Sequence, residues 1–504
     1  MHNAHTRFGT VIDGEPRAGD RSEALIDPAT GAEWGRVEWS TAHIAEAIAS
    51  AQRCVNDGGW AGWSRTERAD LFDEIARGIA PRADELAVLE SRANGKPIAA
   101  TRAEVLAASR WWQYYAALLR GLREEHFQNS PTKRTRIDHE PVGVVGLITP
   151  FNGAFSLATW KLAPALAAGN AVVLKPPVNS PGSSVILATI LRDAGLPADA
   201  VHVLQGDADV GSALVSDPAV GMVSFTGSTA AAKHVASVVS GRLGRFVAEA
   251  GGKSAHLVFA DADIEEAVTA VVQGVFSGSG QTCVAGSRVL VQRSIAAPFR
   301  AALVARVRRL RVGDPRDSTT HLGPIATAQQ LERIEAMVDA AIAEGAEVLC
   351  GGGRPSTLPA ELRGGFWFEP TVLGSSHGTE SVWHEEVFGP VLTLREFGDE
   401  DEAITLANDS RYGLAAGFWT SDVRRVERVS RRLHAGTVWV NCYRGMDWET
   451  PFGGYRESGL GRENGVEGLR EFQQVKSVVV ESGHATDPFG IGEQEQRTSE
   501  ENAS

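Results

Sequence analysis

One cysteine and one glutamate stand in glycine-rich segments that could bring them to a single site. Cys283 lies in the run Gly-Gln-Thr-Cys-Val-Ala-Gly at 280–286, and Glu249 begins the run Glu-Ala-Gly-Gly-Lys-Ser at 249–254. Glycines let backbone approach a ligand closely, and a thiol with a nearby carboxylate can serve as nucleophile and base. The pair predicts covalent catalysis through a thioester. The alternative is that Cys283 is a small buried hydrophobic residue, the commoner role of an unpaired intracellular cysteine.

Length, charge and cysteine content limit the class of protein. The chain has 504 residues, more than one hydrophobic core usually supports, so we expect two or three structural units. Its formal net charge of −14 disfavours nucleic acid and anionic membranes as partners. Residues 1–20 hold no apolar run typical of a signal peptide, and no later segment is long enough to span a membrane, so we expect a cytoplasmic protein. Four scattered cysteines predict neither a disulfide framework nor a metal cluster.

Strand and helix signals alternate along most of the sequence. The N-terminal third shows apolar residues at helical spacing, for example Leu71, Ile75 and Ile79. From residue 142, short runs rich in branched residues are separated by helix-length segments, which predicts a parallel sheet covered on both faces. A second such series predicts a second α/β unit. The expected strands are 142–149, 171–174, 200–204 and 222–226, then 288–292, 347–350, 391–397 and 437–441, with helices around 262–277, 326–344 and 422–434.

Ligands of doubly wound sheets bind where strands end and helices begin. The strand at 142–149 runs into Pro-Phe-Asn-Gly at 150–153, and the strand at 171–174 runs into Lys175, a cation that can meet a phosphate or ribose. The strand at 222–226 runs into Gly227 and Ser228, which favour an anion site if a helix begins there. No Gly-x-Gly-x-x-Gly follows these strands, so spacing alone does not identify a dinucleotide, and each segment taken singly also fits an ordinary loop.

Seven segments resemble, in order and spacing, motifs of the aldehyde dehydrogenase superfamily. They are Thr-Pro-Phe-Asn at 149–152, Lys-Pro at 175–176, Phe-Thr-Gly-Ser-Thr at 225–229, Glu-Ala-Gly-Gly-Lys at 249–253, Gly-Gln-Thr-Cys at 280–283, Glu-Glu-Val-Phe-Gly-Pro at 385–390 and Pro-Phe-Gly-Gly-Tyr at 451–455. The resemblance covers about residues 25–480. It implies an α/β fold with a doubly wound parallel-sheet cofactor domain, an α/β catalytic domain and a small β oligomerisation element, assembled as a homodimer or homotetramer.

The resemblance also implies domain boundaries. We expect an N-terminal tail at 1–20, a cofactor-binding domain at 21–122 and 142–250, a catalytic domain at 251–455, an oligomerisation element at 123–141 and 472–482, and a tail at 484–504 whose polar composition predicts disorder.

The same resemblance assigns roles to individual side chains. Cys283 would attack the aldehyde carbon, the Asn152 amide and the Cys283 backbone N–H would stabilise the oxyanion, and Glu249 would activate the water that hydrolyses the thioester. Lys161 matches the active-site lysine of the family, with a solvated helix lysine as the alternative. NAD or NADP would accept the hydride. The expected cofactor-binding residues are Thr149, Pro150, Phe151, Lys175, Val178, Gly227, Ser228, Gly251, and Glu386 and Phe388 at the nicotinamide ribose and ring.

Departures from the family pattern bear on cofactor and substrate. Val178 stands where many NAD-preferring members carry a glutamate that binds the adenosine ribose; without it Lys175 could pair with a 2′-phosphate, so NADP is admissible. Gly153 and Ser277 replace bulkier residues, so we expect a bulky, ring-bearing or branched aldehyde. Arg444 is interpreted as a surface arginine, with contact to a substrate carboxylate as the alternative. The expected tunnel residues are Gly153, Leu157, Trp160, Ser277, Thr282, Val284, Met446, Trp448 and Phe452.

Two other functions are compatible with these residues. A coenzyme A-acylating semialdehyde dehydrogenase would pass the thioester to a thiol, but that class generally lacks the base that Glu249 supplies. A cysteine esterase or a structural protein would use the fold without redox chemistry, although intact Cys283, Glu249 and Asn152 disfavour an inactive scaffold. We expect a small-molecule aldehyde as the partner and no nucleic acid, membrane or metal.

Overall fold

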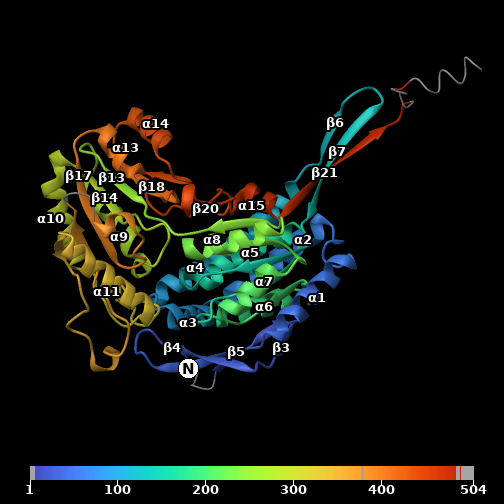
Figure 1. The fold of residues 1–504 in the computed structure, drawn as a ribbon, viewed down its shortest axis with the longest axis horizontal. Coiled ribbons are helices and arrows are strands. Elements are labelled where there is room, and N and C mark those ends of the chain that lie inside the picture. Colours follow the sequence, from blue (N-terminus) through green and yellow to red (C-terminus); the bar gives the residue numbers. More distant parts are fainter. Residues whose placement is uncertain (1–5, 376–377, 379, 484–488, 490–504) are drawn as a thin grey trace, which may run out of the picture.

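Two β-sheets, each covered by helices, form the body of the protein (Figure 1). The computed structural model describes residues 6–375, 378, 380–483 and 489. The predicted combination of a doubly wound parallel sheet and a second α/β unit is confirmed. Within the described residues, no helix has both the length and the apolar character needed to cross a membrane. The tail predicted at 484–504 lies outside the described residues, apart from Phe489.

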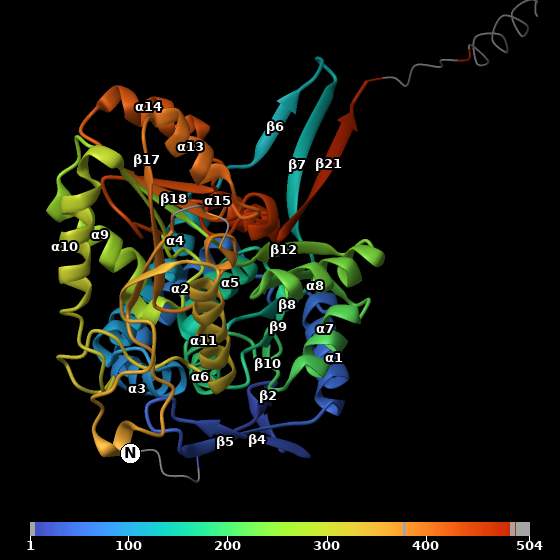
Figure 2. The ribbon, with the colours of Figure 1, turned by 60° about the vertical axis from the view of Figure 1, so that its left-hand side comes forward.

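The first sheet has eight strands in the order β20-β12-β11-β8-β9-β10-β2-β3, and its five central strands are parallel. Figure 2 shows helices α5 and α6 on one side of β8, β9 and β10, and helices α1, α7 and α8 on the other. The strands are β2 (Thr10–Ile12), β3 (Glu15–Arg17), β8 (Val144–Ile148), β9 (Ala171–Lys175), β10 (Val201–Val203), β11 (Val220–Thr226), β12 (Arg245–Glu249) and β20 (Gly459–Leu460). The four strands predicted here are confirmed, and β12 was not predicted.

The N-terminal tail predicted at 1–20 is wrong for residues 6–17. These residues form β1 (Thr6–Phe8), β2 and β3, because Val11 and Ile12 are apolar and become buried when β2 pairs with β10. β1 joins β5 (Glu33–Trp39) and β4 (Arg21–Ile26) in a small separate sheet. The N-terminal segment is therefore part of the first α/β unit.

The second sheet has seven strands in the order β15-β16-β17-β14-β13-β18-β19, all parallel except the pair β15 and β16. Alternating side chains face opposite sides: Leu257 and Leu290 are buried with helices α13 and α14, whereas Val258 and Val289 are buried with α9 and α10. The strands are β13 (Ala255–Val258), β14 (Arg288–Gln292), β15 (Glu347–Cys350), β16 (Thr371–Gly374), β17 (Val391–Phe397), β18 (Ala415–Trp419) and β19 (Thr437–Val440). Strands β13, β16 and β18 were not predicted.

Three antiparallel strands form an arm that extends away from the body (Figures 1 and 2). They are β6 (Glu125–Gln128), β7 (Lys133–Pro141) and β21 (Gln473–Glu481), with β7 in the centre. The hairpin and the distant strand predicted at 123–141 and 472–482 therefore pair as one β element. Its role in assembly stays a prediction.

Fifteen helices of the described residues pack around the sheets, and the expected helices around 262–277, 326–344 and 422–434 correspond to α9, α11 and α14. They are α1 (Ala42–Asn56), α2 (Arg65–Ile79), α3 (Ala83–Asn94), α4 (Ile98–Gly121), α5 (Ala154–Ala167), α6 (Gly182–Asp193), α7 (Ala208–Ser216), α8 (Thr229–Gly241), α9 (Ile264–Phe276), α10 (Ala296–Val307), α11 (Ala328–Ala343), α12 (Ser381–His384), α13 (Glu400–Asn408), α14 (Val423–Arg432) and α15 (Gly465–Glu471).

Candidate active site

The carboxyl ends of the parallel strands in the first sheet bring the predicted ligand-facing segments together. Ile148 at the end of β8 is paired with both Lys175 of β9 and Phe225 of β11. One residue further along, Thr226 is paired with Glu249 of β12. The three strand ends predicted to face a ligand therefore meet at one edge of the sheet, and Glu249 lies beside them.

Residues from the second sheet reach the site from loops that precede strands. Cys283 comes before β14, and Glu386 and Phe388 come before β17, the parallel neighbour of β14. The chain crosses from β12 to β13 through residues 250–254. The site therefore lies between the carboxyl edge of one sheet and the amino edge of the other.

Two glycines on this crossing lie against the segments that carry Glu386 and Cys283. The Gly252 N–H donates a hydrogen bond to Glu386 Oε1 at 2.9 Å. A Cβ atom on Gly251 would collide with the Glu386 carboxylate, and one on Gly252 would collide with the backbone carbonyl of Cys283. The Gly-Gly pair is therefore needed for close approach of three chain segments.

The Cys283 thiol is half-buried and protonated at neutral pH. Burial, and then the nearby carboxylates of Glu386 and Glu249, raise its pKa to about 12, while the positive charge of Arg444 acts in the opposite direction. Because the thiolate is the nucleophilic form, this cysteine needs a base or a cation to activate it.

Asn152 lies against the loop that carries Cys283. Its side-chain Nδ2 donates to the carbonyl oxygen of Gln281 at 2.9 Å. The Gln281 side chain in turn accepts a hydrogen bond from the Ala326 N–H at 3.0 Å. The predicted oxyanion donor and the predicted nucleophile are therefore brought together, and their loop is fixed from both sides.

Glu249 is buried, and neither of its carboxylate oxygens has a hydrogen-bond partner within the described part of the chain. Burial, and then the carboxylate of Glu463, raise its pKa well above the ordinary value. A carboxylate with a raised pKa is suited to accept a proton near neutral pH. The geometry is therefore compatible with the predicted role as a base.

Lys161 is a buried residue of α5, not a solvated helix lysine. Its Nζ donates to Ser224 Oγ at 2.8 Å and forms an ion pair with Glu463. Glu463 also raises the pKa of Glu249, so these groups form one buried charge cluster. Sequence analysis missed Glu463 and Ser224, because Glu463 stands in a polar run, Gly-Arg-Glu-Asn, that is typical of a solvated loop.

The edge of the first sheet has features that fit a dinucleotide. The hydroxyls of Thr149 and Thr226 are buried and lack a hydrogen-bond partner in the described residues. A Cβ on Gly227 would collide with the Phe225 ring, so this position leaves no room for a side chain. Ser228 caps α8, accepting from the Ala231 N–H at 3.3 Å, and a helix N-terminus favours phosphate.

Lys175 is the last residue of the interior strand β9, and Val178 follows it three residues later. Burial lowers the pKa of Lys175 to about 8, and Asp207 partly offsets that effect. Its Nζ donates to the Pro176 carbonyl at 3.4 Å. Val178 is half-buried against the apolar core. No carboxylate is therefore supplied at position 178.

The predicted nicotinamide-side residues also lie together. Phe388 packs edge-to-face on Phe151, with ring centroids 5.9 Å apart, next to the half-buried Pro150. Burial raises the pKa of Glu386 to about 7, and its hydrogen bond from Gly252 partly offsets this. The structure thus joins motifs that lie far apart in the sequence.

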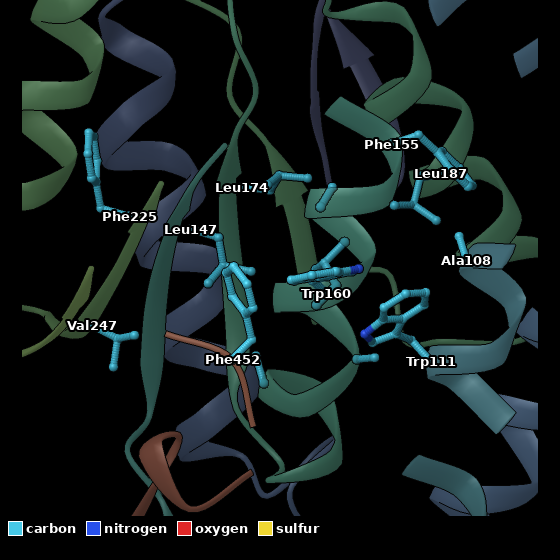
Figure 3. Close-up of a cluster of buried hydrophobic side chains, with 14 of the residues drawn as sticks. Ala108, Trp111, Leu147, Phe155, Trp160, Leu174, Leu187, Phe225, Val247 and Phe452 are labelled. Atoms are coloured by element: carbon cyan, nitrogen blue, oxygen red, sulfur yellow. The ribbon is translucent and has the colours of Figure 1, made fainter. Parts of the chain in front are cut away.

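Four aromatic side chains pack in one row that we call the aromatic wall, and Figure 3 shows Trp111, Trp160 and Phe452 of this row. Trp160 stacks on Trp111 at 5.1 Å between ring centroids, with Phe452 edge-on at 5.5 Å on its other side. Trp448 packs edge-on against Trp111 at 6.2 Å. Trp111, on α4, was missed because it lies far from every motif. Of the other expected tunnel residues, Gly153 and Val284 are buried, and Leu157, Ser277, Thr282 and Met446 are half-buried.

Comparison with known proteins places this fold and site in one family. The profile of the aldehyde dehydrogenase family matches residues 16–478. The betaine aldehyde dehydrogenase of Bacillus subtilis (strain 168) is 38% identical over 477 residues, covering 93% of this chain and 96% of that protein. A crystal structure of betaine aldehyde dehydrogenase from Staphylococcus aureus in complex with NAD+ is 34% identical, with a TM-score of 0.93, and covers 96% of this chain and 97% of that one.

The family match covers the second sheet, the first sheet apart from β2 and the first residue of β3, and every segment that contributes to the site. It confirms the resemblance carried by the seven motifs. The chain therefore belongs to the aldehyde dehydrogenase family, whose members are oxidoreductases that use NAD or NADP.

Proposed function

We propose that this protein oxidises a bulky aldehyde to its carboxylic acid, with NAD or NADP as the oxidant. The observation that carries the proposal is the arrangement around Cys283 between the two sheets: its backbone packs on Gly252, Asn152 donates to Gln281 two residues before it, and Glu249 is near enough to raise the pKa of its thiol. A nucleophile, an oxyanion donor and a buried carboxylate at one place are the parts that this reaction needs.

The reaction begins on Cys283. The thiol gives its proton to a water molecule, and its sulfur bonds to the aldehyde carbon while the carbonyl π bond breaks, which places negative charge on the carbonyl oxygen. Asn152 has a second N–H that the Gln281 carbonyl does not use, and this N–H and the Cys283 backbone N–H stabilise the oxyanion. The nicotinamide cofactor, when bound, accepts the hydride from this carbon.

Glu249 completes the turnover. The acyl group remains on Cys283 as a thioester, and Glu249 takes a proton from the water that attacks it. The C–S bond breaks, the acid leaves and the thiol is regenerated. The raised pKa of Glu249 and its unpartnered oxygens support this role.

The cofactor would lie along the carboxyl edge of the first sheet. Ser228 and the N-terminus of α8 would hold phosphate, and Lys175 would face the ribose end beside Val178. The S. aureus relative was crystallised with NAD+. Val178 places no negative charge against a 2′-phosphate, so the proposal includes NADP as a cofactor.

The aromatic wall supports a substrate with a ring or a branched chain. Trp448 is half-buried and packs in the same row as the buried rings of Trp160 and Phe452, and Gly153 and Ser277 take little space.

We also propose the predicted division into domains, with residues 6–17 joined to the cofactor-binding domain. The arm would assemble two or four copies. Phe127, Val475 and Val479 of the arm are all exposed, and a hollow of about 610 Å³ lies between the arm and the body. A second copy of the chain packed on this surface would remove these exposed apolar side chains from water. Val475→Lys with Val479→Lys should shift sedimentation toward the monomer, and an unchanged sedimentation coefficient would contradict this assignment.

An aldehyde panel assayed with NAD and with NADP tests the catalytic proposal. We expect nicotinamide reduction with aldehydes and release of the free acid, and loss of both in Cys283→Ala while the cofactor still binds. Dependence on coenzyme A would instead favour an acylating enzyme. Ester hydrolysis without any nicotinamide reduction would favour an esterase and contradict the proposal.

A further inference from the structure

Arg444 stands on a loop that is fixed next to the catalytic cysteine. The hydroxyl of Tyr443 donates to the carbonyl oxygen of Val284 at 3.0 Å, one residue after Cys283. On the other side of Arg444, the Trp439 Nε1–H donates to the Gly445 carbonyl at 2.7 Å. Both neighbours of Arg444 are therefore tied down, and the residue is held in place.

The backbone of Arg444 adopts a conformation that is unusual for its residue type. Its φ is 62°, in the left-handed region where side chains other than glycine are uncommon. Glycine would adopt this conformation without strain, so the arginine side chain is retained against a backbone preference. Non-glycine residues in this region concentrate at functional sites.

The guanidinium of Arg444 has an unused donor that points into the protein. Its Nη1 is fully buried and has no hydrogen-bond partner in the part of the chain that the structure describes. Arg288, the fully buried arginine of the same unit, is different: its guanidinium donates to the carbonyls of Lys253, Leu406, Ala407 and Asp409. A buried donor without an acceptor is costly unless a ligand supplies the acceptor.

The positive charge of Arg444 acts on the Cys283 thiol. Burial raises the pKa of both Cys283 and the neighbouring Tyr443, and the positive charge of Arg444 acts in the opposite direction on each. Arg444 is followed on the same loop by Met446 and Trp448, the half-buried apolar residues expected to line the tunnel. Arg444 is therefore near enough to act on the thiol electrostatically, and it stands on the loop that carries two expected tunnel residues.

Resting on the aldehyde oxidation proposed above, we propose that Arg444 binds a carboxylate carried by the substrate, so that the preferred substrate is an anionic aldehyde. The planar guanidinium fork matches the two oxygens of a carboxylate. An aldehyde with a quaternary ammonium group, such as betaine aldehyde, meets a like charge at the same place. This chain therefore differs in substrate charge from the relatives named for betaine aldehyde.

Three ring aldehydes of similar size test this inference: 4-formylbenzoate, its neutral methyl ester, and the cationic 4-formyl-N,N,N-trimethylanilinium. We expect kcat/KM for the carboxylate to exceed that for the ester by about tenfold or more, with the cation poorest. Arg444→Met and Arg444→Gln should bring the carboxylate-to-ester ratio close to one. Arg444→Lys should keep part of the preference, because it retains the charge and loses the fork.

The ratio is the decisive quantity, since a change in thiol reactivity affects both aldehydes alike. Arg424→Met, an exposed arginine of α14, removes the same charge elsewhere and should leave the ratio unchanged. Equal kcat/KM for carboxylate and ester in the unaltered protein would overturn the inference, as would a ratio that survives in both Arg444→Met and Arg444→Gln. Turnover of none of the three aldehydes would instead overturn the oxidation itself.

Discussion

The two sheets contribute to the site with opposite ends. The first sheet presents its carboxyl edge, with Glu249 and Lys175 at or next to strand ends. The second presents its amino edge, so that Cys283 and Glu386 come before their strands. The rule that ligands bind at carboxyl edges of parallel sheets therefore finds only the cofactor half of this site. The nucleophile lies on the other half, because it must face the cofactor across the gap between the sheets.

Asn152, from the first half of the site, donates a hydrogen bond to the Gln281 carbonyl in the loop that carries Cys283. Asn152→Ala removes an oxyanion donor, and we expect the barrier to rise by about 2.7–4 kcal/mol, a loss of roughly a hundredfold to a thousandfold in kcat. Steady-state kinetics measure this effect. Ser156→Ala, four residues further along the chain in the first turn of α5, is the control and should change kcat little. A loss of less than threefold in Asn152→Ala would show that the two halves do not cooperate in this way.

Gly251 and Gly252, on the segment that joins the two sheets, contact different parts of the site. Gly252→Ala drives a methyl group against the Cys283 backbone, whereas Gly251→Ala displaces only the end of the Glu386 side chain. We expect Gly252→Ala to lower the free energy of unfolding by about 1–3 kcal/mol, and Gly251→Ala to act less on stability and more on the KM for the cofactor. Thermal unfolding and cofactor titration separate the two effects.

Gly353→Ala is the matched control, since nothing lies near a Cβ at that position. Equal effects of Gly251→Ala and Gly252→Ala on stability would contradict the contacts assigned to the crossing.

The smallest expected effect lies just after β9, an interior strand of the first sheet. Val178→Glu supplies a carboxylate that accepts hydrogen bonds from a ribose diol and repels a 2′-phosphate. We expect the ratio of kcat/KM for NADP to that for NAD to fall by about tenfold or more. An unchanged ratio would mean that position 178 does not face the ribose, and the tolerance of NADP would lose its support.

Much of the fold follows from local sequence patterns. The strands at 142–149 and 288–292 are apolar runs bounded by turns, and both are found close to the expected positions. β18 was missed because Ala415–Trp419 contains two alanines and a glycine, residues with little strand preference. Its conformation depends on pairing with β13 and β19, and such pairing is a tertiary effect.

The site was predicted unevenly for a similar reason. Cys283, Glu249 and Asn152 stand in recognisable motifs, and the structure brings them together. Glu463 lies outside the motifs and becomes important only when the chain folds back and buries it against Lys161. That burial depends on contacts between segments about 300 residues apart, for which a single sequence holds no local signal.

The central claim is that a thioester forms on Cys283 and that Glu249 directs its hydrolysis. Glu249→Gln keeps the shape of the side chain and removes the base, so we expect steady-state turnover to fall by about a hundredfold to ten-thousandfold. Mixing this variant with aldehyde and cofactor should still give a burst of reduced nicotinamide. Mass spectrometry of the quenched protein should then show the peptide of Cys283 carrying the acyl group. A folded variant with neither the burst nor the acylated peptide would contradict the account.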